Sequence, residues 1–313
     1  MEQFNYCLVV GQTDVGKKRA ANEDNMGNAI TPNGLVSVVC DGMGGHVGGA
    51  TASRIAVDAI LENLKGNYYE DPRIAIGESI DIANRAILNE ASARPELSGM
   101  GSTCVLLIVR NGKVYIGHVG DSRIYLIRSK RIIQLTKDHS YVQMLVDRGE
   151  ITKEQAEHHP RKNEITNALG IPNMSPATIA DDAIIPEAGD CFLLCSDGLS
   201  GMVPDSVINK VVSRQSELSA QARVDRLISI ANDNGGVDNI TAQMVEFTIT
   251  PGAVKPGKRI PLWLKFLISA VALVIAGLGL YFLINHNKDV KEEAEDEVSQ
   301  VHETMCRQGR FHF

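Results

Sequence analysis

Residues 103–128 read TCVLLIVRNGKVYIGHVGDSRIYLIR, three short runs of β-forming residues separated by two tight turns. Val, Ile, Leu and Tyr dominate the runs 103–109, 113–119 and 123–128, as is typical of strands. The dipeptide Asn111–Gly112 is a strong hairpin signal, because both residues of such a turn must tolerate a positive φ. Consecutive strands joined by turns this short predict an antiparallel sheet.

The same alternation of element types continues on both sides of this stretch. Further strands are predicted at residues 35–40, 190–195 and 240–247. Helices are predicted at residues 51–64, 73–91, 204–214 and 219–232, from apolar residues that recur on one helical face. Strand groups alternating with helix pairs predict an α+β fold in which sheets are covered by helices. No phosphate-binding loop or dinucleotide-binding glycine motif follows a strand.

Composition excludes several classes of protein. The chain has 313 residues, 44% hydrophobic and 22% charged, so it is neither a disordered chain nor a polytopic membrane protein. Its formal net charge of −7 argues against nucleic acid as a main partner, because phosphate backbones attract basic surfaces. Aromatic residues make up only 5%, so we expect a core of Val, Ile, Leu and Ala.

The cysteines form no CxxC pair and no dense disulfide framework. Most of them lie in apolar runs, which predicts reduced core residues in a cytosolic compartment rather than a metal site or disulfides. The six are Cys7, Cys40, Cys104, Cys191, Cys195 and Cys306.

The C-terminal part differs from the rest of the chain. Residues 266–284 are 19 consecutive uncharged, mostly apolar residues, long enough at about 1.5 Å per residue to cross the ~30 Å hydrocarbon core. We therefore predict a transmembrane helix at 262–284, after a Pro/Gly/basic linker at 251–261; the alternative is a buried core helix. Four basic residues on the N-terminal side of the uncharged run 266–284 and an acidic tail at 285–313 place residues 1–250 in the cytoplasm, in a single-pass protein of the inner membrane. The basic residues are Lys255, Lys258, Arg259 and Lys265.

Acidic residues recur next to the predicted strands. Asp24, Asp41, Asp197 and Asp238 share one pattern, an apolar run followed by an Asp beside Gly or Asn, and Asp121 joins two strands. One such Asp alone is more often a turn residue. If the strands bring several together, each pair near 4 Å repels by about 1–4 kcal/mol, so the cluster needs cations. Oxygen ligands without His or Cys favour Mg²⁺ or Mn²⁺ over Zn²⁺.

From about residue 7 to residue 247 the sequence resembles the bacterial form of the protein phosphatase 2C family, the metal-dependent serine/threonine phosphatases. Each motif that carries the resemblance is weak alone, but their order and spacing together are highly specific. The motifs are DVGKKRAANED at 14–24, DGMGG at 41–45, GST at 101–103, GHVGDSR at 117–123, LTKDHS at 135–140, HPR at 159–161, CSDGL at 195–199 and DNIT at 238–241.

The resemblance implies a four-layer αββα sandwich, two antiparallel sheets flanked by helix pairs, with two Mn²⁺ or Mg²⁺ ions in the cleft between the sheets. It implies that Asp41 bridges the two ions, that Asp121 binds a third, weaker one, and that Arg19 binds the substrate phosphate. The remaining implied metal ligands are Glu23, Asp24, the Gly42 carbonyl, Asp197 and Asp238. A water bridging the ions would attack phosphorus in phosphoserine or phosphothreonine. Arg19 and Asp41 are thus the candidate catalytic residues.

Two positions depart from the family pattern. Met43 stands where many eukaryotic members have a His thought to protonate the leaving group; because Met cannot donate a proton, we expect a metal-bound water to do so. His46 matches no family position and is better explained as a helix-entry residue than as the acid. His118 replaces an Asn that is common before the Gly-Asp-Ser-Arg motif, without a functional explanation. Residues 138–170 correspond to the flap beside the active site.

Three functions remain open at this point. The first is a membrane-tethered phosphatase acting on phosphorylated proteins, the substrates of a serine/threonine kinase. The second is a hydrolase of small phosphoesters, and the third a membrane-anchored pseudophosphatase that binds phosphoproteins without turnover. In the flap, Lys153, Arg161 and Lys162 are either steering charges for a phosphopeptide or ordinary surface residues.

Overall fold

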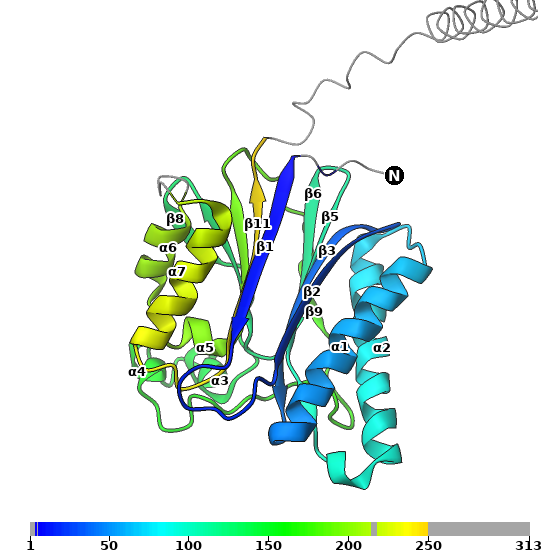
Figure 1. The fold of residues 1–313 in the computed structure, drawn as a ribbon. Helices are drawn as coiled ribbons and strands as arrows, with labels where there is room; N and C mark the ends of the chain where they lie inside the picture. The colour runs from blue at the N-terminus through cyan, green and yellow to red at the C-terminus, as the bar shows by residue number, and fades with distance from the viewer. Residues whose placement is uncertain (1–3, 5, 214–217, 250–313) are drawn as a thin grey trace, which may run out of the picture. The chain divides into compact units, whose positions relative to one another are not determined.

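The structure, a computed structural model, describes Phe4, residues 6–213 and residues 218–249. In this part of the chain two antiparallel sheets lie face to face, and helices cover the outer face of each (Figure 1). The predicted αββα sandwich is therefore confirmed.

One sheet combines the first and last strands of the described chain. Its strand order is β1-β11-β10-β7-β8, so the last described strand, β11, lies beside the first, β1 (Figure 1). The strands are β1 (Cys7–Asp14), β7 (Arg123–Arg128), β8 (Arg131–Gln134), β10 (Cys191–Cys195) and β11 (Ile240–Phe247).

The other sheet has the order β2-β3-β5-β6-β9, and the short β4 pairs with the end of β3. The β5–β6 hairpin turns at Asn111, which has a φ of 52°, as its sequence predicts. The strands are β2 (Asp24–Thr31), β3 (Gly34–Met43), β4 (Gly101–Ser102), β5 (Cys104–Arg110), β6 (Lys113–Val119) and β9 (Thr178–Ile179).

The helices form two groups. The pair α1 (His46–Gly66) and α2 (Pro72–Ala93) covers the β2–β9 sheet, and the pair α6 (Asp205–Val212) and α7 (Ala220–Asp233) covers the other sheet (Figure 1). Shorter helices are η1 (Pro95–Leu97), α3 (Tyr141–Asp147), α4 (Lys153–Glu157) and α5 (Asp197–Ser200).

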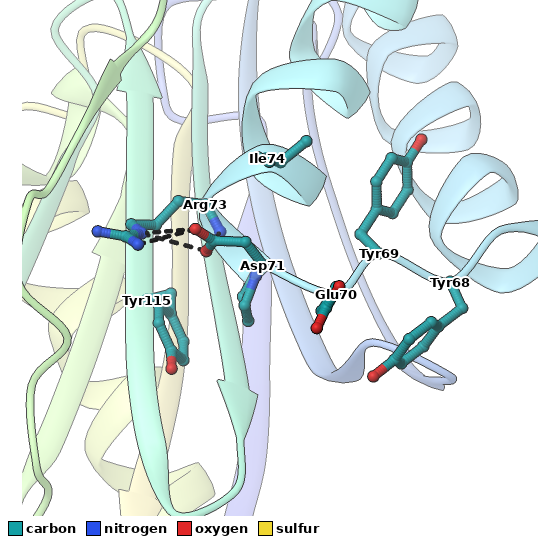
Figure 2. Close-up of a pocket in the computed structure, with 8 residues that line it drawn as sticks. Tyr68, Tyr69, Glu70, Asp71, Arg73, Ile74 and Tyr115 are labelled. Atoms are coloured by element: carbon teal, nitrogen blue, oxygen red, sulfur yellow. Dashed lines mark hydrogen bonds and ion pairs between the residues drawn. The ribbon is translucent and has the colours of Figure 1, made fainter.

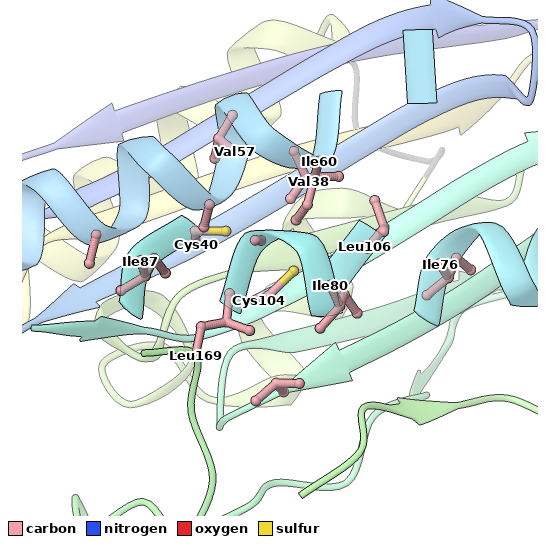
Figure 3. Packing of buried hydrophobic residues seen from close by; sticks show 14 of the residues in the cluster. Val38, Cys40, Val57, Ile60, Ile76, Ile80, Ile87, Cys104, Leu106 and Leu169 are labelled. Carbon is pink, nitrogen blue, oxygen red and sulfur yellow. The ribbon is translucent and has the colours of Figure 1, made fainter. Parts of the chain in front are cut away.

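Apolar side chains fill the spaces between these layers. Figure 3 shows the layer between α1, α2 and their sheet, where Ile60, Ile80 and Leu106 are fully buried. A second cluster lies under α6 and α7, and a third, which includes Phe192 and Phe247, lies between the sheets. Aliphatic residues dominate, as predicted, and burying each such side chain contributes about 1.5–3 kcal/mol.

The five cysteines in the described residues are free, and four of them are core residues, as predicted. Cys40, Cys104, Cys191 and Cys195 are buried, and Cys7 is half-buried. Cys306 lies outside the described residues.

The membrane prediction falls on residues that the structure does not describe. Among residues 4, 6–213 and 218–249, no helix is both long and apolar enough to cross a bilayer. The predicted linker 251–261, span 262–284 and tail 285–313 lie outside this part.

Candidate metal centre

The predicted ligands meet at one end of the sandwich, where the two sheets are joined by hydrogen bonds. The β2–β3 register places Asp24 directly opposite Asp41. From the other sheet, the hydroxyls of Ser196 and Thr241 each donate to Asp24 Oδ2 at 2.7 Å. Asp24 is 7% exposed, so this carboxylate is enclosed by both sheets.

The strand pattern predicted for these acids is only partly right. Asp41 ends an apolar run inside β3, but Asp24 begins β2, and Asp238 precedes β11. Asp197 begins the short helix α5 immediately after β10. The five aspartates therefore come together from both starts and ends of strands, because neighbouring antiparallel strands bring opposite ends to the same edge.

Glu23 and Gly42 are held by close backbone packing. The Gly42 N–H donates to the Glu23 carbonyl at 3.2 Å, and Ser53 Oγ donates to the same carbonyl at 2.5 Å. The Glu23 carboxylate lies against Gly49 of α1, where a Cβ would stand 1.9 Å from Glu23 Oε2. A side chain at position 49 would therefore displace Glu23.

Asn239 connects this region to β11. Its side-chain carbonyl accepts the Glu23 N–H at 2.8 Å, and its amide nitrogen donates to the carbonyls of Val15 and Ala21. Beside it, Arg19 Nη2 donates to Asp238 Oδ2 at 2.8 Å. Arg19 is exposed, so its guanidinium lies at the open side of the site with one donor edge already paired.

Asp121 lies in the turn between β6 and β7, next to the end of β3. Thr103 Oγ1 connects the two places: it accepts the Asp41 N–H at 3.0 Å and lies 2.7 Å from Ser122 Oγ. The Thr103 N–H also donates to the Asp41 carbonyl at 2.8 Å. The position of the Asp121 turn is thus fixed relative to Asp41.

These carboxylates act on one another electrostatically. Burial raises the pKa of Asp41 well above its usual range, and the charges of Asp24, Asp197, Asp121 and Asp238 raise it further. Burial is also the main cause that raises the pKa of Asp24 to about 7 and that of Asp121 to about 8. The pKa of Asp197 is raised by burial and by Asp238. A cluster whose members oppose each other's ionisation needs compensating positive charge.

The residues fit the divalent cations that the sequence predicted. Asp24 Oδ1 and Asp197 Oδ1 are buried without a hydrogen-bond partner. Such burial costs free energy unless another group, such as a cation, binds the oxygen. The donor set consists of oxygen atoms, which suits Mg²⁺ and Mn²⁺. In the described ranges, no group of three or more His, Cys, Asp or Glu side chains is already arranged to hold a metal ion.

Residues 14–247 match the protein phosphatase 2C family. The chain belongs to this family. Serine/threonine phosphatase stp of Listeria monocytogenes is 40% identical over 245 residues, which cover 76% of this chain and 95% of the relative. The match is consistent with the order of motifs between Asp14 and Phe247.

Solved structures of protein phosphatase 2C relatives share the fold. The S. agalactiae serine/threonine phosphatase superposes with a TM-score of 0.72 at 32% identity, covering 77% of this chain and 99% of that one. The catalytic domain of the phosphatase PstP, solved in complex with two manganese ions, has a TM-score of 0.67 at 33% identity; 77% and 97% of the two chains are covered. The latter structure shows that a relative with this fold holds two ions.

Sequence reasoning missed the residues that hold the family's acidic cluster together. Ser196, Thr241 and Asn239 lie inside motifs that the resemblance identified, but only their acidic neighbours were assigned a role. A usable signal was present, since each is a small polar residue in a buried strand or beside one, where an unpaired hydroxyl or amide is costly.

The three basic flap residues, Lys153, Arg161 and Lys162, lie on the surface. Arg161 pairs with Glu164 at 2.6 Å, and its guanidinium carbon lies 3.6 Å from the centre of the Tyr141 ring. Lys153 and Lys162 are exposed. Arg161 is thus already paired with Glu164 and Tyr141. A steering role for the three basic residues stays a prediction.

A cavity of about 610 Å³ lies away from the acidic cluster. Figure 2 shows it between the start of α2 and β6, lined by Tyr68, Tyr69 and Tyr115, with Arg73 paired to Asp71. Tyr115 is near the start of β6, whereas Asp121 follows its end. This cavity is therefore not part of the candidate metal centre.

Proposed function

We propose that this protein hydrolyses phosphoserine and phosphothreonine in other proteins, using two Mn²⁺ or Mg²⁺ ions at the acidic cluster. The enzyme class, a protein serine/threonine phosphatase, is that of the family. The observation that carries the proposal is the cluster of five mutually interacting aspartates, with Asp24 Oδ1 and Asp197 Oδ1 buried and unpaired.

The proposed ligands are those that the sequence named. Asp41 would be the ligand that the two ions share, which its electrostatic interaction with each of the other four aspartates supports. Asp121 would hold a third, weaker ion. The full proposed set is Glu23, Asp24, Asp41, the Gly42 carbonyl, Asp121, Asp197 and Asp238.

The chain's own residues supply binding and orientation. When bound, the two cations supply a lowered pKa for an attacking water and positive charge beside the phosphoryl oxygens. Arg19 lies at the open side of the site, where its planar guanidinium suits bidentate contact with a phosphate. To engage substrate fully, Arg19 exchanges its 2.8 Å contact with Asp238 for the phosphate. Met43 has no proton to give, so the proton for the leaving group comes from water.

A metal-dependence assay with a phosphothreonine peptide tests this function. We expect hydrolysis with Mn²⁺, its loss with EDTA, and its absence in D41N. Rates on a small aryl phosphate and on a phosphotyrosine peptide separate the alternatives. A strong preference for either over phosphothreonine and phosphoserine would contradict the proposal, and metal binding without turnover would support a pseudophosphatase.

The chain is also proposed to be tethered to the inner membrane by residues 262–284, with residues 1–250 in the cytoplasm. The support is the run of 19 uncharged residues and its basic flank. After cell fractionation we expect the chain in the membrane pellet, resistant to sodium carbonate, and a chain ending at residue 250 in the supernatant. Recovery of the full chain in the supernatant would contradict the tether without affecting the proposed chemistry.

A further inference from the structure

The histidine after Asp138 lies at the junction between the flap segment and the turn that carries Asp121. The His139 N–H donates to the Gly120 carbonyl at 3.0 Å, and the Gly120 N–H donates to His139 Nδ1 at 3.2 Å. His139 thus pairs with both the N–H and the carbonyl of Gly120. On its other side, the His139 carbonyl accepts the N–H of Thr166 at 2.7 Å.

The hydrogen bonds determine the form of the imidazole. A backbone N–H can only donate, so Nδ1 of His139 must be unprotonated in this arrangement. The ring proton is then on Nε2, which lies 3.0 Å from Thr178 Oγ1 on β9. Burial and the neighbouring His118 lower the pKa of His139 to about 4, which keeps the ring neutral near pH 7.

The ring is also held by its neighbours. His118 stacks on His139 with ring centroids 4.6 Å apart, and His118 Nε2 lies 2.7 Å from the Lys137 carbonyl. A cavity of about 330 Å³ borders His139 and Thr178 on the solvent side. The His139 imidazole therefore lies between the His118 ring and this cavity.

Gly120 transmits this contact to the acidic cluster. Its φ is +97°, and a Cβ there would stand 2.6 Å from Thr103 Cγ2, so the turn is packed against the same threonine that hydrogen-bonds to Asp41. His139 holds the turn from the outside and Thr103 from the inside. Asp121 is the next residue.

We propose that His139 is a positioning residue for Asp121. Through the Gly120 peptide, His139 couples the flap segment to the weakest cation site. The inference rests on the proposed function for the role of Asp121. It adds a residue that touches neither ion nor substrate. Displacing the flap at Thr166 would, through His139, loosen the turn that holds Asp121.

Two substitutions at position 139 separate the effect of the hydrogen-bond acceptor from the effect of side-chain volume. H139F keeps a ring on His118 but has no acceptor, whereas H139N keeps an acceptor oxygen near the place of Nδ1. T178V removes the hydroxyl beside Nε2, and H158A, at an exposed histidine, is the matched control.

The first measurement needs no bound metal. In the full chain with EDTA, hydrogen–deuterium exchange of peptides covering residues 117–124 is expected to be about tenfold faster in H139F. Near wild-type exchange is expected in H139N and H158A, with an intermediate value in T178V. Equal exchange in H139F and H139N would overturn the proposal. If H139F does not fold, an unchanged rate in T178V would do so.

The second measurement is Mn²⁺ titration by calorimetry. H139F should weaken the weakest Mn²⁺ site by about 10–100-fold and leave the tighter sites unchanged, as is typical of residues that orient a ligand. H139N should restore most of this affinity. Weakening of every site equally would show a general structural defect and overturn the proposal. Because exchange and binding are measured without substrate, failure of the phosphatase assay leaves both results interpretable.

Discussion

Two groups of buried charge in this protein are compensated in opposite ways. Under α7, Arg223 Nη2 donates to Glu246 Oε2 at 2.5 Å, and Arg223 Nη1 donates to the Val212 carbonyl at 2.7 Å. At the end of the sandwich, burial and the charges of the neighbouring aspartates raise the pKa of Asp41. The first group carries its own counter-charge and serves the fold. The second depends on charge from outside, which is the property of a binding site.

Substituting a member of the acidic cluster should therefore affect activity and stability in opposite directions. D41N removes the proposed bridging ligand, and we expect activity on a phosphothreonine peptide to fall by at least about 10³-fold. In EDTA the same variant should unfold at higher urea concentration than wild type, because a neutral amide replaces a carboxyl whose ionisation is opposed by burial and by its acidic neighbours, a gain of about 1 kcal/mol. If D41N is destabilised in EDTA, the repulsion argument fails.

Substituting one member of the Arg223–Glu246 pair should instead lower stability and leave activity unchanged. R223L leaves the Glu246 carboxylate buried without its counter-charge, which costs about 3–5 kcal/mol in the free energy of unfolding. The activity of the folded fraction should remain near wild type. The matched control is R223L/E246L, in which both charges are removed and most of the stability should return. A double variant as unstable as R223L would show that packing, rather than charge, accounts for the loss.

Features that neighbouring residues specify were predictable from the sequence, and features that depend on tertiary contacts were not. Runs such as Cys104–Arg110 and the Asn111–Gly112 turn specify their structure locally, and they were predicted nearly to their observed bounds. Strand β2, Asp24–Thr31, has no apolar alternation and was missed. It is a strand because β3 provides its hydrogen bonds and because Gly27 fits under α1, where a Cβ would stand 2.8 Å from Val57 and Leu61.

The site was predictable residue by residue but not as an arrangement. Motif resemblance named Asp24 and Asp41, which are adjacent in space through the β2–β3 register. The contact between Asp24 and Thr241, 217 residues apart, depends on the packing of two sheets and leaves no local pattern. His139 was quoted within a motif, yet its hydrogen bond to Gly120 is visible only once the β6–β7 turn is placed.

A pH series should show the acidic cluster without any substitution. The pKa of Asp24 is raised to about 7 and that of Asp121 to about 8, so both carboxyls bind protons more tightly in the folded than in the unfolded chain. Stability in EDTA should then be greatest below about pH 4 for these groups and fall as the pH rises toward about 8, by a few kcal/mol in total.

Mn²⁺ should reverse that trend. The ligands must be deprotonated to bind the ion, so the stabilisation by Mn²⁺ should grow over the same pH interval. Urea unfolding in EDTA and in Mn²⁺ at several pH values measures both slopes. D24N is the control, since it should flatten the EDTA curve in part. Identical slopes with and without metal would contradict the assignment of the cluster as a cation site.

The smallest expected effect concerns Arg19, an exposed cation that borders the acidic cluster. R19K keeps a positive charge near Asp238 but cannot contact phosphate bidentately, so we expect about a tenfold loss of kcat/KM, mostly through KM. K18A, at an exposed neighbour, is the control and should be close to wild type. Because Arg19 is exposed, stability should hardly change, unlike the loss at buried Arg223. A fall in kcat with unchanged KM would instead assign Arg19 to the transition state, and unchanged kinetics would mean that its contact with Asp238 is only a surface ion pair.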